Sequence, residues 1–161
     1  MATTGEHHPA FEEYCECIFE LREDHIDVIQ ARVADRLGVS RPSVSEMIKR
    51  MELEGLIVIR GAKISLTSDG DVLAERVVRR HRIAERFLTD VLGLSWANAH
   101  HEAGKWEHIM NQDVESAMNR VLHNPTTCPH GNPIPGSSYR QERLSPLSDV
   151  LEGKLFTISR I

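Results

Sequence analysis

The sequence predicts a mainly α-helical fold with a winged helix-turn-helix at its amino-terminal end and a second helical domain after it. Two helical stretches separated by a tight turn at 38–40 are followed by a short segment of period 2, which is the order of elements in a winged helix-turn-helix. Three short clusters of histidines and carboxylates flank this module. We expect domains at 1–70 and 71–140, followed by a tail at 141–161.

The elements of the first domain are indicated by apolar spacing and by capping residues. Residues 11–23 place Tyr14, Ile18 and Leu21 on one face of a first helix. Asp27 is expected to cap a second helix, which ends at Gly38, and Ser40 to cap a third helix that runs to residue 55. The runs 56–59 and 64–66 then predict a β-hairpin with a cationic tip, which is the wing.

Three more helices are expected after the wing, at 69–92, 96–110 and 113–122. The apolar stripe of the first of these comprises Val72, Leu73, Val77, Ile83, Ala84, Phe87, Leu88 and Val91. Prolines and glycines make 124–136 an irregular connector.

Composition indicates a cytoplasmic protein with no membrane segment. The chain has 161 residues and 40% hydrophobic residues, and it carries neither a secretory signal nor an apolar run that could cross a bilayer. Three cysteines, Cys15, Cys17 and Cys128, form neither a disulfide framework nor a zinc ribbon, and we interpret them as small thiols without a metal role.

The net charge of −5 is unfavourable for binding DNA, whose phosphates attract Lys and Arg. Residues 1–24 hold seven acidic residues against one basic residue, whereas 25–65 hold seven basic against five acidic. The acidic segment 1–24 adjoins the mildly basic DNA-binding segment 25–65, and it would repel DNA unless a bound divalent cation neutralised it.

The histidine and carboxylate clusters have helical spacing. Steps of three, four, seven or eight residues return to one helix face, so each cluster can direct its side chains at a common point. Side chains from three such helix faces could together coordinate one divalent cation. The clusters are Glu13 with Glu16, His81 with Glu85, and His100 with Glu107 and His108.

The third helix and the wing supply the candidate DNA contacts. The first turn of the recognition helix is expected in the major groove, and three cations are placed for phosphates. The expected base-contacting and phosphate-contacting residues at the helix start are Ser40, Arg41, Pro42 and Ser43, and the cations are Lys49, Arg50 and Lys63.

Three longer runs resemble a known family. The runs 81–88 (HRIAERFL), 102–108 (EAGKWEH) and 131–136 (GNPIPG) look like those of the iron- and manganese-dependent repressors of the diphtheria toxin repressor family, and the resemblance covers about residues 10–138. It implies a winged-helix domain, a helical dimerisation domain with two metal positions per subunit, and often an SH3-like β-domain at the carboxyl end. Such repressors bind a palindromic operator when the cation is abundant.

The resemblance also implies ligands. It assigns His81, Glu85 and His100 to one metal position and Glu13, Glu107 and His108 to the other, and Glu16 matches a ligand of the manganese-responsive branch. Gly104 stands where family members usually have a cysteine or carboxylate.

This set of nitrogen and oxygen donors favours Mn²⁺ or Fe²⁺, with Mn²⁺ slightly preferred, although Zn²⁺, Co²⁺ or Ni²⁺ would bind in vitro. The tail 144–161 resembles the opening of the SH3-like domain up to its first strand, so either the domain is truncated there or the strand pairs with another element.

The sequence therefore predicts a homodimeric, metal-dependent transcriptional repressor rather than an enzyme. A dimer is expected because one helix-turn-helix reads too few base pairs. Two alternatives stay open. One is a helical-bundle metalloenzyme, although paired Glu-x-x-His motifs are missing. The other is a winged-helix regulator that responds to thiol oxidation at Cys15 and Cys17 or acts without a ligand. His130 is interpreted as a surface or structural residue.

Overall fold

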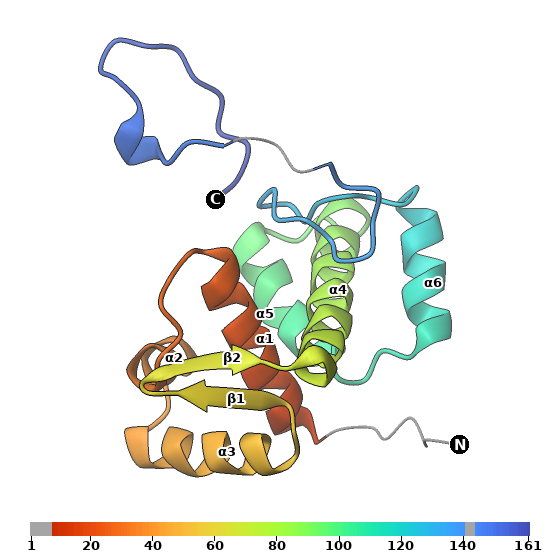
Figure 1. Cartoon of the computed structure of the whole chain (residues 1–161). Helices are drawn as coiled ribbons and strands as arrows, with labels where there is room; N and C mark the ends of the chain where they lie inside the picture. Colours follow the sequence, from red (N-terminus) through yellow and green to blue (C-terminus); the bar gives the residue numbers. More distant parts are fainter. Residues whose placement is uncertain (1–7, 141–143) are drawn as a thin grey trace. The chain divides into compact units, whose positions relative to one another are not determined.

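A computed structural model describes residues 8–140 and 144–161 and confirms the mainly helical fold. Along the chain run α1 (Pro9–Glu23), α2 (Gln30–Leu37), α3 (Arg41–Leu53), β1 (Ile57–Arg60), β2 (Lys63–Leu66), α4 (Ser68–Asp90), α5 (Trp96–Trp106), α6 (Gln112–Val121) and the short 3-10 helix η1 (Leu147–Asp149) (Figure 1). The chain divides into two compact units between Val78 and Arg79, so that α4 begins in the first unit and ends in the second.

The helix-turn-helix is formed by α2 and α3, as predicted. Gly38 ends α2 with φ 65°, a left-handed conformation that glycine adopts without strain. The Ser40 hydroxyl then accepts a hydrogen bond from the backbone N–H of Ser43 and caps α3. The prediction that Asp27 caps α2 is wrong: the chain is still extended at Ile29, and the Asp27 carboxylate binds Lys63 Nζ at 2.8 Å.

The wing is the antiparallel pair β1 and β2, in the register Ile57↔Leu66 and Ile59↔Ile64. Ile57, Ile64 and Leu66 are buried beneath it, whereas the two-residue turn after Arg60 is exposed. Thr67 ends the wing and starts α4, because its hydroxyl donates to the Gly55 carbonyl and accepts from the Gly70 backbone N–H.

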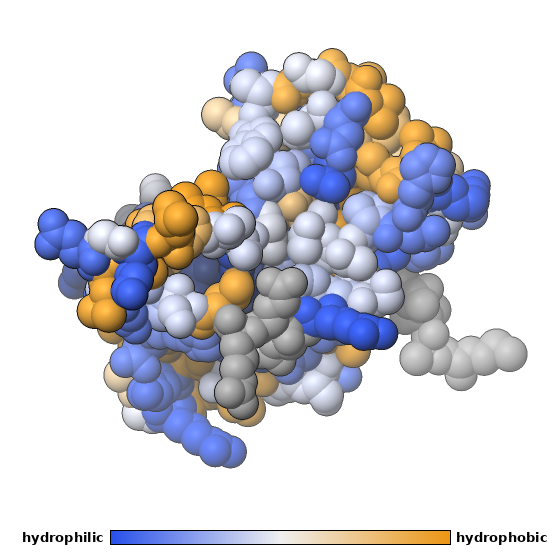
Figure 2. Space-filling view, turned by 90° about the horizontal axis from the view of Figure 1, so that it is seen from above, coloured by the Kyte–Doolittle hydropathy of each residue, from blue (hydrophilic) through white to orange (hydrophobic). Residues whose placement is uncertain are grey.

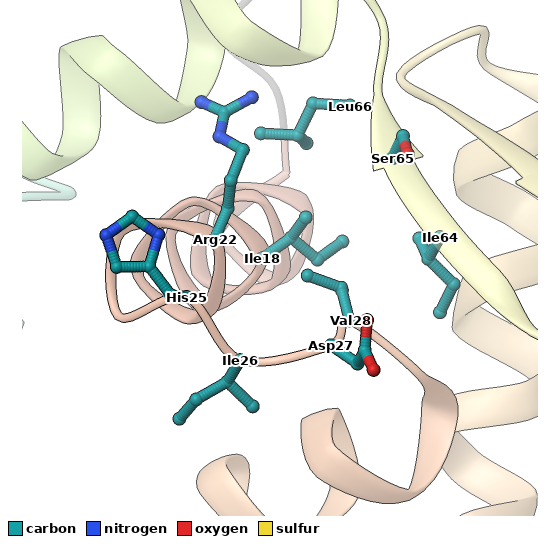
Figure 3. A pocket seen from close by; sticks show the side chains of 9 residues that line it. All are labelled: Ile18, Arg22, His25, Ile26, Asp27, Val28, Ile64, Ser65 and Leu66. Atoms are coloured by element: carbon teal, nitrogen blue, oxygen red, sulfur yellow. The ribbon is translucent and has the colours of Figure 1, made fainter.

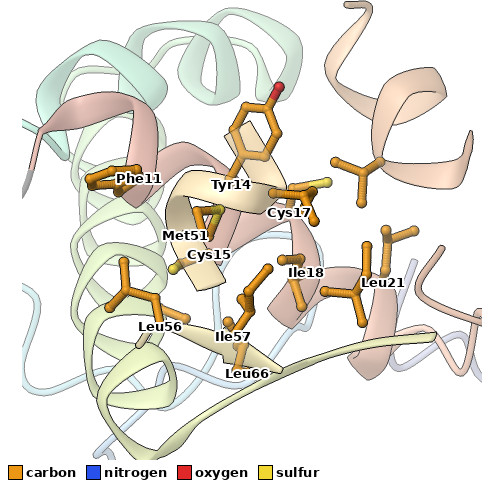
Figure 4. Close-up of a cluster of buried hydrophobic side chains, with 14 of the residues drawn as sticks. Phe11, Tyr14, Cys15, Cys17, Ile18, Leu21, Met51, Leu56, Ile57 and Leu66 are labelled. Atoms are coloured by element: carbon orange, nitrogen blue, oxygen red, sulfur yellow. The ribbon is translucent and has the colours of Figure 1, made fainter. Parts of the chain in front are cut away.

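The core of the first unit joins α1 to α3 and the wing. Tyr14, Ile18 and Leu21 are buried on the predicted face of α1, and they pack in one cluster with Met51 and Ile57 (Figure 4). This cluster fixes the helix-turn-helix and the wing as one body.

In the second unit, the end of α4 packs against α5. Ala84 and Leu88 from α4 contact Ala99 and Ala103 from α5, with Met110 alongside. In the stripe predicted for α4, Phe87 is half-buried and two residues are exposed: Val72, which is 69% exposed near the amino-terminal end of the helix, and Val91, which is 48% exposed beyond its last residue. Helix α5 also ends earlier than predicted, at Trp106, because Asn111 already caps α6.

The connector 124–136 is irregular, as predicted, but it is firmly held. Arg79 donates to the Pro135 carbonyl at 2.8 Å, and Arg82 donates to the Pro133 carbonyl. The strand predicted at the end of the tail does not form: 151–161 contain no strand, although the Ile161 backbone N–H donates to the His130 carbonyl at 2.9 Å.

Candidate metal centre and nucleic-acid interface

Three of the predicted ligands meet in the second unit. Helix α4 presents His81 and Glu85 one turn apart, and α5 presents His100. The His100 Nδ1 atom lies 2.8 Å from Glu85 Oε1 and 3.0 Å from His81 Nε2, and His81 Nε2 lies 3.5 Å from Glu85 Oε1. Three such atoms lie this close either because an imidazole N–H hydrogen is shared between them or because a cation binds all three.

The spacing of these three atoms fits one divalent cation. With metal–ligand bonds of about 2.1 Å, neighbouring ligand atoms lie about 3.0 Å apart in an octahedral site and about 3.4 Å apart in a tetrahedral one. Both geometries lie within the observed range of 2.8–3.5 Å. The site is also accessible, because the His100 side chain is 62% exposed while Glu85 is buried.

The electrostatics of Glu85 keep it in its metal-binding form. Burial raises the pKa of this carboxyl group, but hydrogen bonds from His100 and His81 outweigh burial and hold the pKa well below its usual range. Glu85 is therefore a carboxylate at neutral pH, as a metal ligand must be.

Glu107 contacts both of the neighbouring histidines. Its Oε2 atom lies 2.5 Å from His81 Nδ1, and its Oε1 atom lies 3.2 Å from His108 Nε2. A carboxylate bound to Nδ1 favours a proton on that atom, so Nε2 is the ring atom that can give up its proton and bind a cation, and Nε2 is the atom that faces Glu85 and His100. Sequence spacing did not predict this contact between α4 and the end of α5.

The other two predicted ligands belong to the first unit. Glu13 is exposed on α1 and Glu16 is half-buried. The ligand set that would combine them with Glu107 and His108 stays a prediction. Gly104 lies on α5 with no atom within 4 Å of the place where a Cβ would stand, so close helix packing does not explain this glycine.

The structure also brings two residues to Glu85 that sequence reasoning set aside. Cys128 is buried and His130 is half-buried, and with Glu85 they form a second group of potential metal ligands. The Cys128 Sγ atom lies 3.9 Å from His130 Nδ1, so this thiol has a partner within the connector. The spacing Cys-x-His was the one signal in the sequence.

The predicted DNA-contacting residues are all exposed in the first unit. Ser40, Arg41, Pro42 and Ser43 form the exposed start of α3, and Lys49 lies two turns further along it. Two of the predicted cations have partners: the Arg50 guanidinium lies 5.4 Å from the Phe11 ring centre, and Lys63 pairs with Asp27. Arg60, which faces Lys63 across the wing, is a further exposed cation that the predicted set left out.

An open groove of about 330 Å³ lies in the first unit between the end of α1, the following loop and β2. Ile18, Val28 and Ile64 line it, together with Arg22 and Asp27 at its rim (Figure 3). None of the predicted metal ligands or DNA-contacting residues belongs to its lining, and its two charged residues are already paired with Asp71 and Lys63.

Several large apolar side chains are exposed, and hydrophobic patches alternate with hydrophilic ones on the surface (Figure 2). In the second unit they include Leu92, Ile109, Val114 and Val121. Within 8–140 and 144–161, none of the helices combines the length and apolarity needed to cross a membrane.

Comparison with known proteins identifies two family domains in the chain. Residues 8–63 match the model of the iron-dependent repressor amino-terminal DNA-binding domain, and residues 67–136 match that of the iron-dependent repressor metal-binding and dimerisation domain. Together they span both units.

Named relatives agree with these matches. The chain is 48% identical over 126 residues to the iron-dependent repressor IdeR of Mycobacterium tuberculosis and 44% identical over 126 residues to the diphtheria toxin repressor of Corynebacterium diphtheriae. The matched region covers 78% of this chain but only 55% and 56% of those relatives, so the chain spans about half of their length.

Solved structures show the same fold. A manganese-dependent transcriptional repressor in complex with manganese has a TM-score of 0.75 and 33% identity, covering 81% of this chain and 60% of that one. ScaR with bound Cd²⁺ has a TM-score of 0.71 and 30% identity, covering 88% of this chain and 68% of that one. Since both domains and their order match, this chain belongs to the diphtheria toxin repressor family.

Proposed function

We propose that this chain is a metal-dependent transcriptional repressor of the cytoplasm, which binds Mn²⁺ or Fe²⁺ and then a palindromic DNA operator of metal homeostasis genes as a homodimer. The observation that carries the proposal is the group formed by His81, Glu85 and His100, whose donor atoms lie at the spacing expected around one divalent cation. Relatives of the chain are named as iron-dependent repressors and a manganese-dependent repressor.

Two metal positions belong to the proposal. His81, Glu85 and His100 are proposed to hold the first, Glu13, Glu107 and His108 are proposed to hold the second, and Glu16 is a further candidate ligand. Ligands made of imidazole and carboxylate suit Mn²⁺ and Fe²⁺. In this arrangement Glu107 has two tasks, because it contacts His81 as well as His108.

DNA is proposed to meet the start of α3, where Ser40, Arg41, Pro42 and Ser43 are exposed. Lys49 and Arg50 would contact phosphates. At the wing, Arg60 is proposed to contribute beside Lys63, because Lys63 must exchange its Asp27 partner for a phosphate.

A homodimer is proposed through the second unit. Its exposed apolar side chains Leu92, Ile109, Val114 and Val121 are the kind of surface that a second copy covers. Sedimentation should show a dimer at micromolar concentration, and a monomer with or without metal would contradict this part of the proposal.

The experiment that tests the function is metal-titrated DNA binding. A duplex is first selected from a random pool in the presence of Mn²⁺, and binding to it is then measured against Mn²⁺ and, without oxygen, against Fe²⁺. DNA affinity should rise with either metal and fall on chelation. Because binding linkage is reciprocal, the duplex should raise Mn²⁺ affinity by the same factor. Equal DNA affinity with metal and with chelator would refute the proposal.

The thiol-responsive alternative from the sequence makes a different prediction in this assay. A thiol sensor would respond to oxidant rather than to chelator. Burial, with a smaller contribution from nearby carboxylates, raises the pKa of Cys15 to about 12. Burial likewise raises the pKa of Cys17 to about 12. Both groups are therefore unreactive thiols at neutral pH, and this chemistry does not favour a sensor.

A further inference from the structure

The connector between α6 and the tail carries a rigid turn beside the metal centre. The Gly131 backbone N–H donates to the Cys128 carbonyl at 3.0 Å, which closes a four-residue turn with Pro129 in its second position. The Cys128 N–H donates in turn to the Asn132 carbonyl at 2.9 Å. These bonds fix Cys128 and His130 relative to each other before any ligand arrives.

Two arginines of α4 hold this connector against the helix that carries Glu85. Arg82, which is buried and lies one turn before Glu85, donates to the Pro133 carbonyl, and Arg79 donates to the Pro135 carbonyl. The turn is therefore placed by side chains on the same helix that places Glu85.

The result is a group of three donors from two elements. The His130 Nδ1 atom lies 3.6 Å from Glu85 Oε1 and 3.9 Å from Cys128 Sγ, and the three donor atoms lie within 4.8 Å of one another. Cys128 and Glu85 are buried, whereas the His130 side chain is 26% exposed. The group thus combines a closed interior with one side open to a cation from solvent.

We propose that Cys128, His130 and Glu85 form a further metal position, one that takes a thiophilic divalent cation such as Zn²⁺ or Co²⁺. A thiolate, an imidazole and a carboxylate are the donor types of tetrahedral Zn²⁺ sites, with a fourth place for water. On binding, the S–H bond of Cys128 breaks, sulfur keeps the electron pair that it donates to the cation, and the proton leaves to solvent.

This position differs in chemistry from the one proposed for Mn²⁺ or Fe²⁺. The donors of His81 and His100 are imidazoles, whereas Cys128 adds sulfur, which selects softer cations. Glu85 belongs to both groups, so its carboxylate either bridges two cations or binds one of them at a time. The inference goes beyond the proposed repressor function and does not depend on DNA binding.

Cobalt titration of the 161-residue chain tests the inference directly. Co²⁺ is added to the reduced protein in a buffer without thiols, and absorption is followed in the near ultraviolet, where sulfur-to-cobalt charge transfer appears only if a thiolate is a ligand. The wild-type chain should develop this band in a saturable manner, and excess Zn²⁺ should abolish it. Quenching of Trp96, whose ring lies 5.1 Å from that of His130, gives a second readout.

Variants show which residues produce the sulfur-to-cobalt charge-transfer band. Cys128→Ser should remove it, and His130→Gln should lower the Co²⁺ affinity by about tenfold or more, since even changes to groups around a ligand cost that much. Cys17→Ala, which removes a buried thiol from the other unit, is the control and should keep the band. Thermal unfolding followed by circular dichroism checks that each variant is folded.

A wild-type chain without the charge-transfer band, or a band that survives in Cys128→Ser, would overturn the inference. So would a band that depends on Cys17. Mn²⁺-dependent DNA binding, measured on the same wild-type samples, separates the two proposals. If the cobalt band appears but Mn²⁺ does not raise DNA affinity, the repressor function is refuted. If Mn²⁺ raises DNA affinity but the cobalt band is absent, the thiolate position is refuted.

Discussion

Replacing Glu107 by glutamine tests whether the contact between this carboxylate and His81 supports the metal centre. The Glu107 Oε2 atom lies 2.5 Å from His81 Nδ1, and both side chains are buried. A hydrogen bond to a charged group contributes about 1.5–3 kcal/mol, against about 0.5–1.5 kcal/mol for a neutral one. Glutamine keeps an acceptor oxygen but loses the charge, so about 1–1.5 kcal/mol of support for the His81 tautomer should be lost.

This loss corresponds to about a tenfold weaker metal affinity at the position that contains His81, because 1.4 kcal/mol is a factor of ten. Changes to carboxylates that orient a metal-bound histidine cost about 10- to 100-fold in general. Calorimetric Mn²⁺ titration of the wild-type chain and of Glu107→Gln measures the difference. A larger loss, shared with His108→Ala, would indicate that Glu107 is also a direct ligand.

Glu102→Gln is the matched control, since Glu102 lies on α5 shortly before Glu107 and pairs with the exposed Lys105 at 2.8 Å. Its Mn²⁺ affinity should equal that of the wild-type chain. The reasoning is refuted if Glu107→Gln binds Mn²⁺ as tightly as Glu102→Gln does.

Three further changes probe the fold and its buried charges. Gly104→Ala should raise the free energy of unfolding by about 0.5–1 kcal/mol in urea, because alanine favours the helix and meets no atom within 4 Å; destabilisation would contradict this. Glu115→Ala should lower it by about 2–4 kcal/mol, because the buried Glu115 binds Arg79 at 2.6 Å, and an unchanged urea midpoint would speak against a structural role for this pair. Folding raises the pKa of Cys15 and Cys17 from 9.0 to about 12, so stability should be fully present below pH 9 and decline as the pH rises towards 12. Both thiols should also react slowly with a disulfide reagent at neutral pH, and fast labelling of the native protein would show that they are not protected.

Local features of the fold could be predicted from the sequence because they depend on neighbours along the chain. Ser40 caps α3 through a residue three positions away, and Gly38 ends α2 through its own backbone conformation. The pairing of His81 with Glu85 follows from one helical turn.

Features that depend on distant partners could not be predicted in this way. Aspartate is a residue type that often caps helices, but the Asp27 carboxylate binds Lys63 of the wing, 36 residues away. Cys128 and His130 lie close to Glu85 in a connector whose carbonyls accept hydrogen bonds from arginines of α4. A spacing of two residues in a loop carries no geometric meaning until those long-range hydrogen bonds fix the loop.

The charge of the first helix links the fold to the proposed switch. Sequence counting suggested that the acidic amino-terminal end would repel DNA, yet part of that charge is neutralised within the first unit. Arg76 binds the buried Glu12 at 3.0 Å, and Arg36 binds both Glu20 and Asp24. Glu13, by contrast, is exposed, and it is one of the proposed ligands of the second position. A cation at that position would therefore offset the negative charge of an exposed carboxylate on the acidic helix, and because solvent and salt screen exposed charges, its effect on DNA affinity should weaken as the salt concentration rises.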